Sequence, residues 1–201
     1  MKRFCRVTAP GVANGRVRRK NNWRRTPNYY NTAQGRPVID RERPGPGHRH
    51  LLLKRDVERF IALLPEWSEL SRGLNAVVLA TDEPDCDGWY RRGVVAVCAW
   101  PRELWFEVTH RWYAAHWPFL ERIGVPVEPT GEGDIVCRYT EATARAYQLL
   151  HVLLHEFGHH HDLMTTRSRR QCARGETYAE EYAFRYEAII WERYLNEFGL
   201  Y

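Results

Sequence analysis

The chain has 201 residues, of which 44% are hydrophobic and 13% aromatic, and its formal net charge at pH 7 is +5. This length is enough for one domain with a buried core, so we expect a single folded unit. No run of eighteen apolar residues occurs, and the first ten residues lack the apolar region of a secretory signal. These absences argue against a membrane-spanning or secreted protein, and we expect a cytoplasmic protein without a membrane partner.

Basic residues concentrate toward the N-terminus. Residues 1–59 hold sixteen Lys and Arg against four Asp and Glu, a balance of +12, whereas residues 60–201 hold fourteen against twenty-one, a balance of −7. Residues 1–47 are also rich in Asn, Gly and Pro and show no apolar period, so we expect a disordered or loosely docked arm. Such an arm could bind an acidic partner or nucleic acid, because clustered Arg and Lys neutralise phosphates, although a solubilising tail is the preferred interpretation.

The five cysteines are odd in number, widely spaced and without a C-x-x-C pair. This pattern fits reduced thiols better than a disulfide framework or a cysteine-based zinc site, in agreement with a cytoplasmic location.

The folded domain is expected to span residues 48–201. Apolar residues on one face predict a first helix that ends at Pro65. Two apolar, β-rich runs at residues 75–81 and 93–100 predict buried strands, and the stretch between residues 82 and 88 is rich in turn-forming residues.

The second half of this domain is expected to be mainly helical. We predict a helix from Arg102 to about Arg122, with an aromatic cluster that packs in the core, and then a third strand at residues 134–140. Apolar residues at steps of three and four, without proline, predict a long helix at residues 141–163. A last helix is expected to run to about Asn196.

The helix at residues 141–163 carries the most informative motif, an H-E-x-x-H sequence made of His155, Glu156 and His159. Random order of this composition would give roughly 0.04 such matches per chain. Positions i and i+4 of a helix share a face, so both imidazoles could bind one Zn²⁺ while Glu156 lies beside a water that the metal activates. The motif therefore predicts a hydrolytic zinc site with Glu156 as general base and acid.

A catalytic zinc takes three protein ligands, and the third is expected on the last helix. Glu176 and Glu180 are four residues apart and share a face. We expect Glu176 to be the ligand, while Glu180 could accept the outer N–H of a ligating imidazole and fix its tautomer. Glu180 and Glu181 remain open as alternative ligands.

On these residues the chain resembles the gluzincins, the zinc peptidases in which H-E-x-x-H is completed by a glutamate of a downstream E-x-x-A-[D/E] motif. Here that second motif is Glu176, Ala179 and Glu180, and the run from Glu176 to Ala183 is similar to that of small single-domain forms such as the ImmA/IrrE-like peptidases. The likeness covers residues 141–190. It implies one Zn²⁺ per chain held by His155, His159 and Glu176, a zincin-like α+β domain, and a peptide or protein substrate.

A strand next to the metal helix would hold an extended substrate by β-augmentation, and we expect the strand at residues 134–140 in this place. The oxyanion also needs an electrophilic partner, for which Tyr139, His151, Arg174 and Tyr178 are available. Two other functions stay open: a catalytically inactive zincin-like interaction module, and a metal-containing protein that binds nucleic acid through the basic arm.

Overall fold

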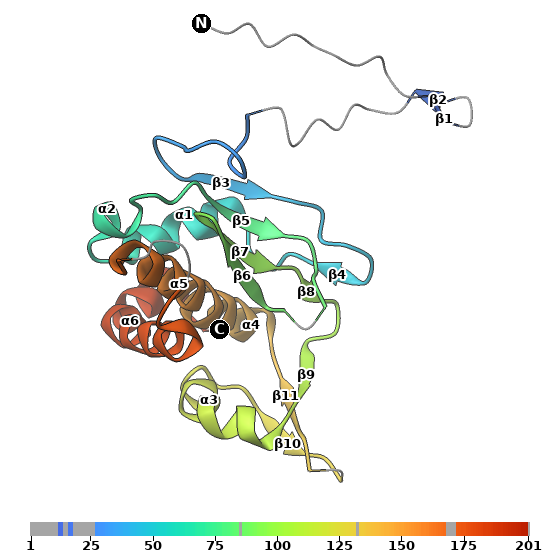
Figure 1. The fold of residues 1–201 in the computed structure, drawn as a ribbon. Helices are drawn as coiled ribbons and strands as arrows, with labels where there is room; N and C mark the ends of the chain where they lie inside the picture. The colour runs from blue at the N-terminus through green and yellow to red at the C-terminus, as the bar shows by residue number, and fades with distance from the viewer. Residues whose placement is uncertain are drawn as a thin grey trace, which may run out of the picture.

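The structure, a computed structural model, describes residues 27–84, 86–131, 133–167 and 172–200, and the backbone of two short paired strands. These two strands are β1 (Val12–Ala13) and β2 (Arg16–Val17). The described chain forms one four-stranded sheet with helices packed beside it, and a smaller layer of one helix and three strands below (Figure 1). The α+β class expected from the sequence is confirmed.

The main sheet is mixed, with the strand order β3-β5-β7-β6. Its strands are β3 (Val38–Arg41), β5 (Ala76–Ala80), β6 (Gly88–Arg91) and β7 (Val94–Cys98). β3, β5 and β7 are parallel to one another, and β6 pairs antiparallel with β7 at the edge. β5 and β7 confirm the two predicted buried strands. The sheet begins before residue 48, inside the segment assigned to the arm, and residues 1–26 of that arm lie outside the part whose side chains are described.

Both faces of the central strands are buried, which explains their continuous apolar runs. Alternate residues point to opposite faces. One set, including Val77, Leu79 and Val95, joins the main core under the helices. The other set is smaller and packs with Tyr29, whose hydroxyl donates to Oδ2 of Asp40 at 3.0 Å. The segment before β3 therefore covers the second face of the sheet.

A three-stranded antiparallel sheet carries the lower layer, with the order β10-β11-β9. Its strands are β9 (Trp105–Val108), β10 (Val127–Pro129) and β11 (Ile135–Arg138). The helix predicted from Arg102 begins later, as α3 (His110–Arg122), because Thr109 caps it by accepting a hydrogen bond from the Trp112 backbone N–H at 3.2 Å. Residues 105–108 instead pair with β11. β4 (His48–Arg49) and β8 (Trp100–Pro101) pair antiparallel as a separate two-stranded sheet.

The remaining helices are α1 (Lys54–Leu63), α2 (Trp67–Leu70), α4 (Glu141–Tyr147), α5 (Leu154–Thr165) and α6 (Gly175–Phe198). Of these, α1 and α5 contact the main sheet, and α6 packs against α5 and α1. A π-helical segment, η1 (Gln148–Leu153), joins α4 to α5, so the predicted long helix is continuous from residue 141 to 165. Within the described part of the chain, no helix is both long and apolar enough to cross a bilayer.

Candidate metal centre

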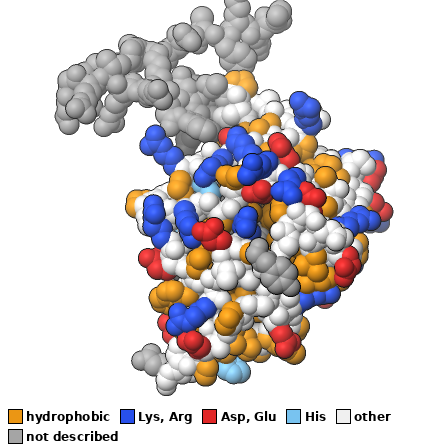
Figure 2. Space-filling view, turned by 180° about the vertical axis from the view of Figure 1, so that it is seen from behind, with side chains coloured by type: hydrophobic (Ala, Val, Ile, Leu, Met, Phe, Trp, Pro, Cys, Tyr) orange, Lys and Arg blue, Asp and Glu red, His pale blue; other side chains and the backbone are white. Residues whose placement is uncertain are grey.

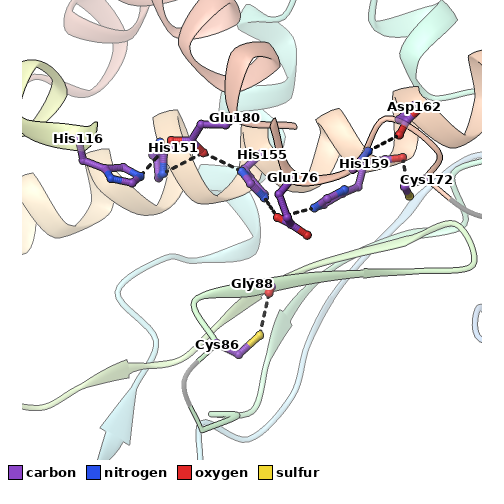
Figure 3. A network of polar contacts seen from close by, with 11 residues as sticks. Cys86, Gly88, His116, His151, His155, His159, Asp162, Cys172, Glu176 and Glu180 are labelled. Atoms are coloured by element: carbon purple, nitrogen blue, oxygen red, sulfur yellow. Dashed lines mark hydrogen bonds and ion pairs between the residues drawn. The ribbon is translucent and has the colours of Figure 1, made fainter. Parts of the chain in front are cut away.

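The H-E-x-x-H motif lies on α5, which continues the helix that begins at Glu141. Thr140 caps this helix: its hydroxyl accepts from the Thr143 backbone N–H at 3.1 Å, and the Thr143 hydroxyl accepts from the Thr140 backbone N–H at 2.9 Å. The following apolar residues are buried against the sheet, so the helix is fixed over β6 and β7. His155 and His159 consequently project from one side of a rigid element (Figure 3).

Two small residues set the distance between α5 and α6. A Cβ atom at Gly158 would lie 2.7 Å from the Cα of Ala179 and 3.0 Å from its carbonyl oxygen, so only glycine fits there. Ala179 in turn is fully buried. The glycine of the first motif and the alanine of the second thus allow the two helices to cross in backbone contact. Their crossing brings the histidines of α5 beside the glutamates of α6.

Asp162 anchors the start of α6 to the end of α5. Its carboxylate is fully buried and accepts hydrogen bonds from the backbone N–H of Arg174 at 2.8 Å, from Nε of Arg174 at 2.8 Å and from the backbone N–H of Gly175 at 3.2 Å. Burial raises the pKa of this carboxyl, but these hydrogen bonds outweigh burial and hold the pKa below its usual value. Asp162 therefore fixes the first turn of α6, one residue before Glu176.

The three predicted ligands converge at this crossing. Oε2 of Glu176 lies 3.1 Å from Nε2 of His155 and 3.4 Å from Nε2 of His159. In Figure 3 the Glu176 side chain reaches between the two imidazoles. The three ligand atoms lie within 4.8 Å of one another. The structure therefore brings His155, His159 and Glu176 together, and Glu181 is absent from this group of described residues.

Glu180 contacts the opposite side of His155. Its Oε2 lies 3.0 Å from Nδ1 of His155, while Glu176 faces Nε2 of the same ring. This is the outer position that the four-residue spacing predicted, in which a carboxylate accepts the N–H of a ligating imidazole. Glu180 is thus placed to orient the His155 ring, and Glu176 is placed to bind the same metal ion as His155.

The contacts of the His155 ring require more than one proton or a bound metal ion. Both ring nitrogens face carboxylate oxygens, which only accept when ionised, whereas a neutral imidazole carries one N–H. One of the two contacts therefore needs a second proton or a metal ion. Two imidazole nitrogens and a carboxylate oxygen are a donor set that Zn²⁺ takes, and bonds of about 2.0–2.2 Å place tetrahedral ligand atoms roughly 3.3–3.6 Å apart. The observed separation of 3.4 Å lies within this range, and that of 3.1 Å is slightly shorter.

Burial and charge act on the two imidazoles in opposite ways. Burial lowers the pKa of His155, but its hydrogen bond with Glu180 and the charges of Glu156 and Glu176 outweigh burial and raise the pKa above its ordinary value. Burial lowers the pKa of His159, and the neighbouring His155 lowers it further. His159 is thereby favoured in the neutral form that binds a metal.

Glu156 is nearly buried, with 6% of its surface exposed, and its Oε2 has no hydrogen-bond partner within the described structure. Burial raises its pKa to about 7. A carboxyl with a pKa near neutral pH is suited to take up and return a proton. The unpartnered oxygen leaves Glu156 able to accept a hydrogen bond from a molecule in the site.

A cavity of about 870 Å³ opens over these residues. His155, Glu156 and Glu176 line one wall, and β6 lines the other with Gly88, Trp89 and Tyr90. A Cβ at Gly88 would lie 2.6 Å from Cγ1 of Val152 and 3.1 Å from Cγ of Glu156, so glycine allows the strand to approach the helix. The expectation that residues 134–140 form the strand beside the metal helix is wrong, because β11 belongs to the lower sheet and β6 takes this place.

Comparison of the chain with family models, curated proteins and solved structures finds no match. The candidate centre therefore rests on the residues of this chain and their geometry.

The other histidines of the motif region have packing roles. His160 is fully buried and bridges the hydroxyl of Tyr90, at 3.2 Å, and the carbonyl oxygen of Arg72, at 3.0 Å. His161 lies 2.7 Å from the hydroxyl of Tyr178. Neither residue belongs to the group formed by His155, His159 and Glu176.

Of the four side chains considered as electrophiles, only His151 lines the cavity. Tyr139 is buried against Trp100, Tyr178 bonds to His161, and Arg174 is held by Asp162.

His116 is a residue of the site that was not predicted from the sequence. Its Nε2 lies 3.0 Å from Oε1 of Glu180, and its side chain also lines the cavity. No signal in the sequence connects it to the motif, because it stands on α3, and two strands of the lower sheet separate that helix from the motif helix along the chain. Only the packing of α3 beside η1 and α6 brings His116 to the site.

Proposed function

We propose that the chain is a zinc-dependent metallopeptidase of the gluzincin type that hydrolyses peptide bonds. One observation carries this proposal: His155, His159 and Glu176 converge at the mouth of a cavity, with the buried Glu156 beside them. This combination of two imidazoles, a carboxylate ligand and a separate acid–base carboxyl is the set that metal-assisted hydrolysis needs. The likeness of both motifs to those of gluzincins supports the same proposal.

Glu156 performs the proton transfers of the proposed hydrolysis. A bound zinc ion would supply Lewis acidity, which lowers the pKa of water and polarises a carbonyl group. The Glu156 carboxylate accepts a proton from the attacking water and then donates it to the leaving amine. Its raised pKa makes both transfers feasible near neutral pH. Glu180 orients the His155 ring through Nδ1 and does not take part in proton transfer.

The edge strand β6 supports a peptide substrate. β6 pairs only with β7 among the described strands, so its outer edge offers backbone N–H and C=O groups along the cavity. An extended peptide could add to this edge and lie across the ligand side chains. Trp89 and Tyr90 of the same strand line the cavity and would contact the side chains of such a peptide.

The nucleic-acid alternative has little support in the described residues. Figure 2 shows Lys and Arg side chains lying among Asp and Glu side chains on one face. Several basic side chains of the described chain form ion pairs. Among them are Arg49 with Glu141, Arg91 with Glu83 and Arg138 with Glu128. We retain a cytoplasmic location as part of the proposal, supported by the free thiols of the four described cysteines, Cys86, Cys98, Cys137 and Cys172.

A peptide-library assay tests the proposal. Zinc-loaded wild-type protein is incubated with a mixture of peptides, and new termini are identified by mass spectrometry. We expect cleavage that a chelator abolishes and that Glu156→Gln reduces at least ~100-fold at unchanged zinc content. Glu181→Gln, an exposed neighbour outside the ligand group, serves as the matched control and should cleave normally. Equal cleavage by Glu156→Gln would contradict the role of Glu156 as general base, and no cleavage by the zinc-loaded wild type would favour the interaction module.

A further inference from the structure

A second cluster of potential ligands lies beside the candidate metal centre. It comprises His116 from α3, His151 from η1 and Glu180 from α6, three elements that are distant in the sequence. His116 is 8% exposed and His151 6% exposed, so both imidazoles are more than nine-tenths buried. Figure 3 shows the two rings directed at the Glu180 carboxylate, on the side away from Glu176. The three ligand atoms lie within 4.8 Å of one another.

The distances in this cluster are close to those of a metal coordination shell. Nε2 of His116 lies 3.0 Å from Oε1 of Glu180, and Nε2 of His151 lies 3.8 Å from Oε2. Ligand atoms bound to one zinc at about 2.0–2.2 Å are roughly 3.3–3.6 Å apart in tetrahedral geometry. The two observed distances lie on either side of this separation. A small adjustment of the Glu180 side chain would bring one carboxylate oxygen equally close to both imidazoles.

The tautomer of His116 is fixed by its own helix. Nδ1 lies 2.7 Å from the carbonyl oxygen of Trp112, which can only accept, so Nδ1 carries the proton. A neutral ring then presents the lone pair of Nε2 to Glu180. The Trp112 indole stacks on the ring at a centroid distance of 4.0 Å and holds its orientation. A metal-ligating histidine is commonly oriented in this way, with its second N–H on a backbone carbonyl.

A lone pair and a carboxylate that face each other at 3.0 Å repel unless a positive charge lies between them. A second proton on the ring or a metal ion would supply this charge. Oε1 of Glu180 is buried, and no described residue meets hydrogen-bond geometry with it, although Nε2 of His116 lies 3.0 Å away. A buried polar atom without a partner destabilises the fold, and more so when it is charged. A cation bound between His116, His151 and Glu180 would remove this destabilisation.

We propose that His116, His151 and Glu180 form a second metal site, which binds a divalent transition metal of the zinc type. Two imidazoles and one carboxylate favour zinc, cobalt or nickel over calcium and magnesium, which prefer oxygen ligands. All three residues line the same cavity as the candidate metal centre, and the cavity gives the ion a route of entry. The π-helical η1, which carries His151, is a local irregularity of the kind frequent at functional sites.

This second ion would hold Glu180 in place. Oε2 of Glu180 contacts Nδ1 of His155, so the two sites are linked through one carboxylate and one imidazole. The second metal ion would therefore position His155, a ligand of the candidate centre, by holding Glu180 in place. This site does not depend on peptidase activity, and either site can exist without the other.

Zinc titration of the full chain tests the second site. The metal-free protein is prepared with a chelator, reconstituted with zinc, freed of excess metal and weighed by native mass spectrometry. We expect about two zinc ions per wild-type chain and about one in either His116→Gln or Glu176→Ala. His110→Gln is the matched control, because His110 stands on the same helix α3 but is exposed. His151→Gln is the second variant, in case His116→Gln does not fold by circular dichroism.

The outcomes separate this site from the proposed peptidase centre. Loss of one ion in His116→Gln or His151→Gln, with retention in His110→Gln, supports the second site whatever Glu176→Ala shows. A single ion in the wild type that Glu176→Ala removes and that both histidine variants retain overturns the second site and leaves the peptidase proposal intact. A single ion removed by the histidine variants and retained by Glu176→Ala supports the second site and contradicts the first.

Discussion

A Cβ atom at Gly158 would lie 2.7 Å from the Cα of Ala179, so the two helices that carry the candidate ligands touch through their backbones at this point. The same addition would meet Cβ of Tyr182 at 3.0 Å. Neither neighbour is the far end of a flexible side chain, and the contact therefore cannot relax without moving α6. The separation of His155 and His159 from Glu176 depends on this crossing.

We expect Gly158→Ala to destabilise the fold and to weaken zinc binding together. Overpacking costs about 1–3 kcal/mol, while the better helix propensity of alanine returns up to about 1 kcal/mol. Urea unfolding and zinc titration measure the two effects. Gly35→Ala is the control, since nothing lies within 4 Å of a Cβ there. Unchanged zinc affinity in Gly158→Ala would show that the crossing does not set the ligand geometry.

Asp162→Asn should loosen the start of α6. The variant loses the negative charge and one of the two oxygens that accept from Arg174 and Gly175, and we expect a loss of about 1–3 kcal/mol of unfolding free energy at pH 7. Because the pKa of Asp162 is lowered, its stabilisation is present above the ordinary carboxyl pKa and is lost only as pH falls through the lower folded-state value. The difference between wild type and variant should therefore persist at pH 5, as measured by thermal unfolding. A difference that vanishes already at pH 5 contradicts this assignment.

Glu156→Gln should stabilise the metal-free protein at alkaline pH. Burial raises the pKa of Glu156 from 4.5 to about 7, so its contribution to stability is full below pH 4.5 and is lost as pH rises through 7. Ionisation of this buried carboxyl then costs up to about 3 kcal/mol at pH 8. The neutral amide avoids this cost, and the melting temperature of the variant should exceed that of wild type at pH 8 but not at pH 4.5. Equal melting temperatures at pH 8 would show that Glu156 is solvated.

Glu180→Gln should weaken zinc binding at the centre formed by His155, His159 and Glu176 about 10- to 100-fold, although Glu180 is not a ligand of that centre. An amide oxygen can still accept from Nδ1 of His155, but it lacks the charge that favours this ring orientation. Glu181→Gln provides the matched comparison on the same helix. Competition with a chromophoric chelator measures both affinities. Identical affinities in the two variants would remove Glu180 from the centre.

The helices that carry the candidate ligands were predictable because their signals are local. The three- and four-residue period of residues 141–163, and the four-residue spacings of His155 with His159 and of Glu176 with Glu180, depend only on helix geometry. The contact of Glu180 with Nδ1 of His155 followed from the same spacing.

The parts that were missed depend on pairing between distant segments. β6 follows a turn-rich stretch directly and has no alternating pattern, and only its partner β7 makes it a strand. Residues 105–108 share their aromatic character with α3, and their pairing with β11 separates them from that helix. His116 joins the site through the packing of α3, which no spacing in the sequence encodes.

The zinc content of Glu176→Ala is the decisive test of the candidate metal centre. Wild type, Glu176→Ala and Glu181→Ala are purified without added metal, and zinc per chain is measured by mass spectrometry with a parallel protein determination. We expect about one zinc ion fewer in Glu176→Ala than in wild type, and no change in Glu181→Ala. Equal zinc content in wild type and Glu176→Ala, or no zinc in wild type after reconstitution, would contradict a centre formed by His155, His159 and Glu176.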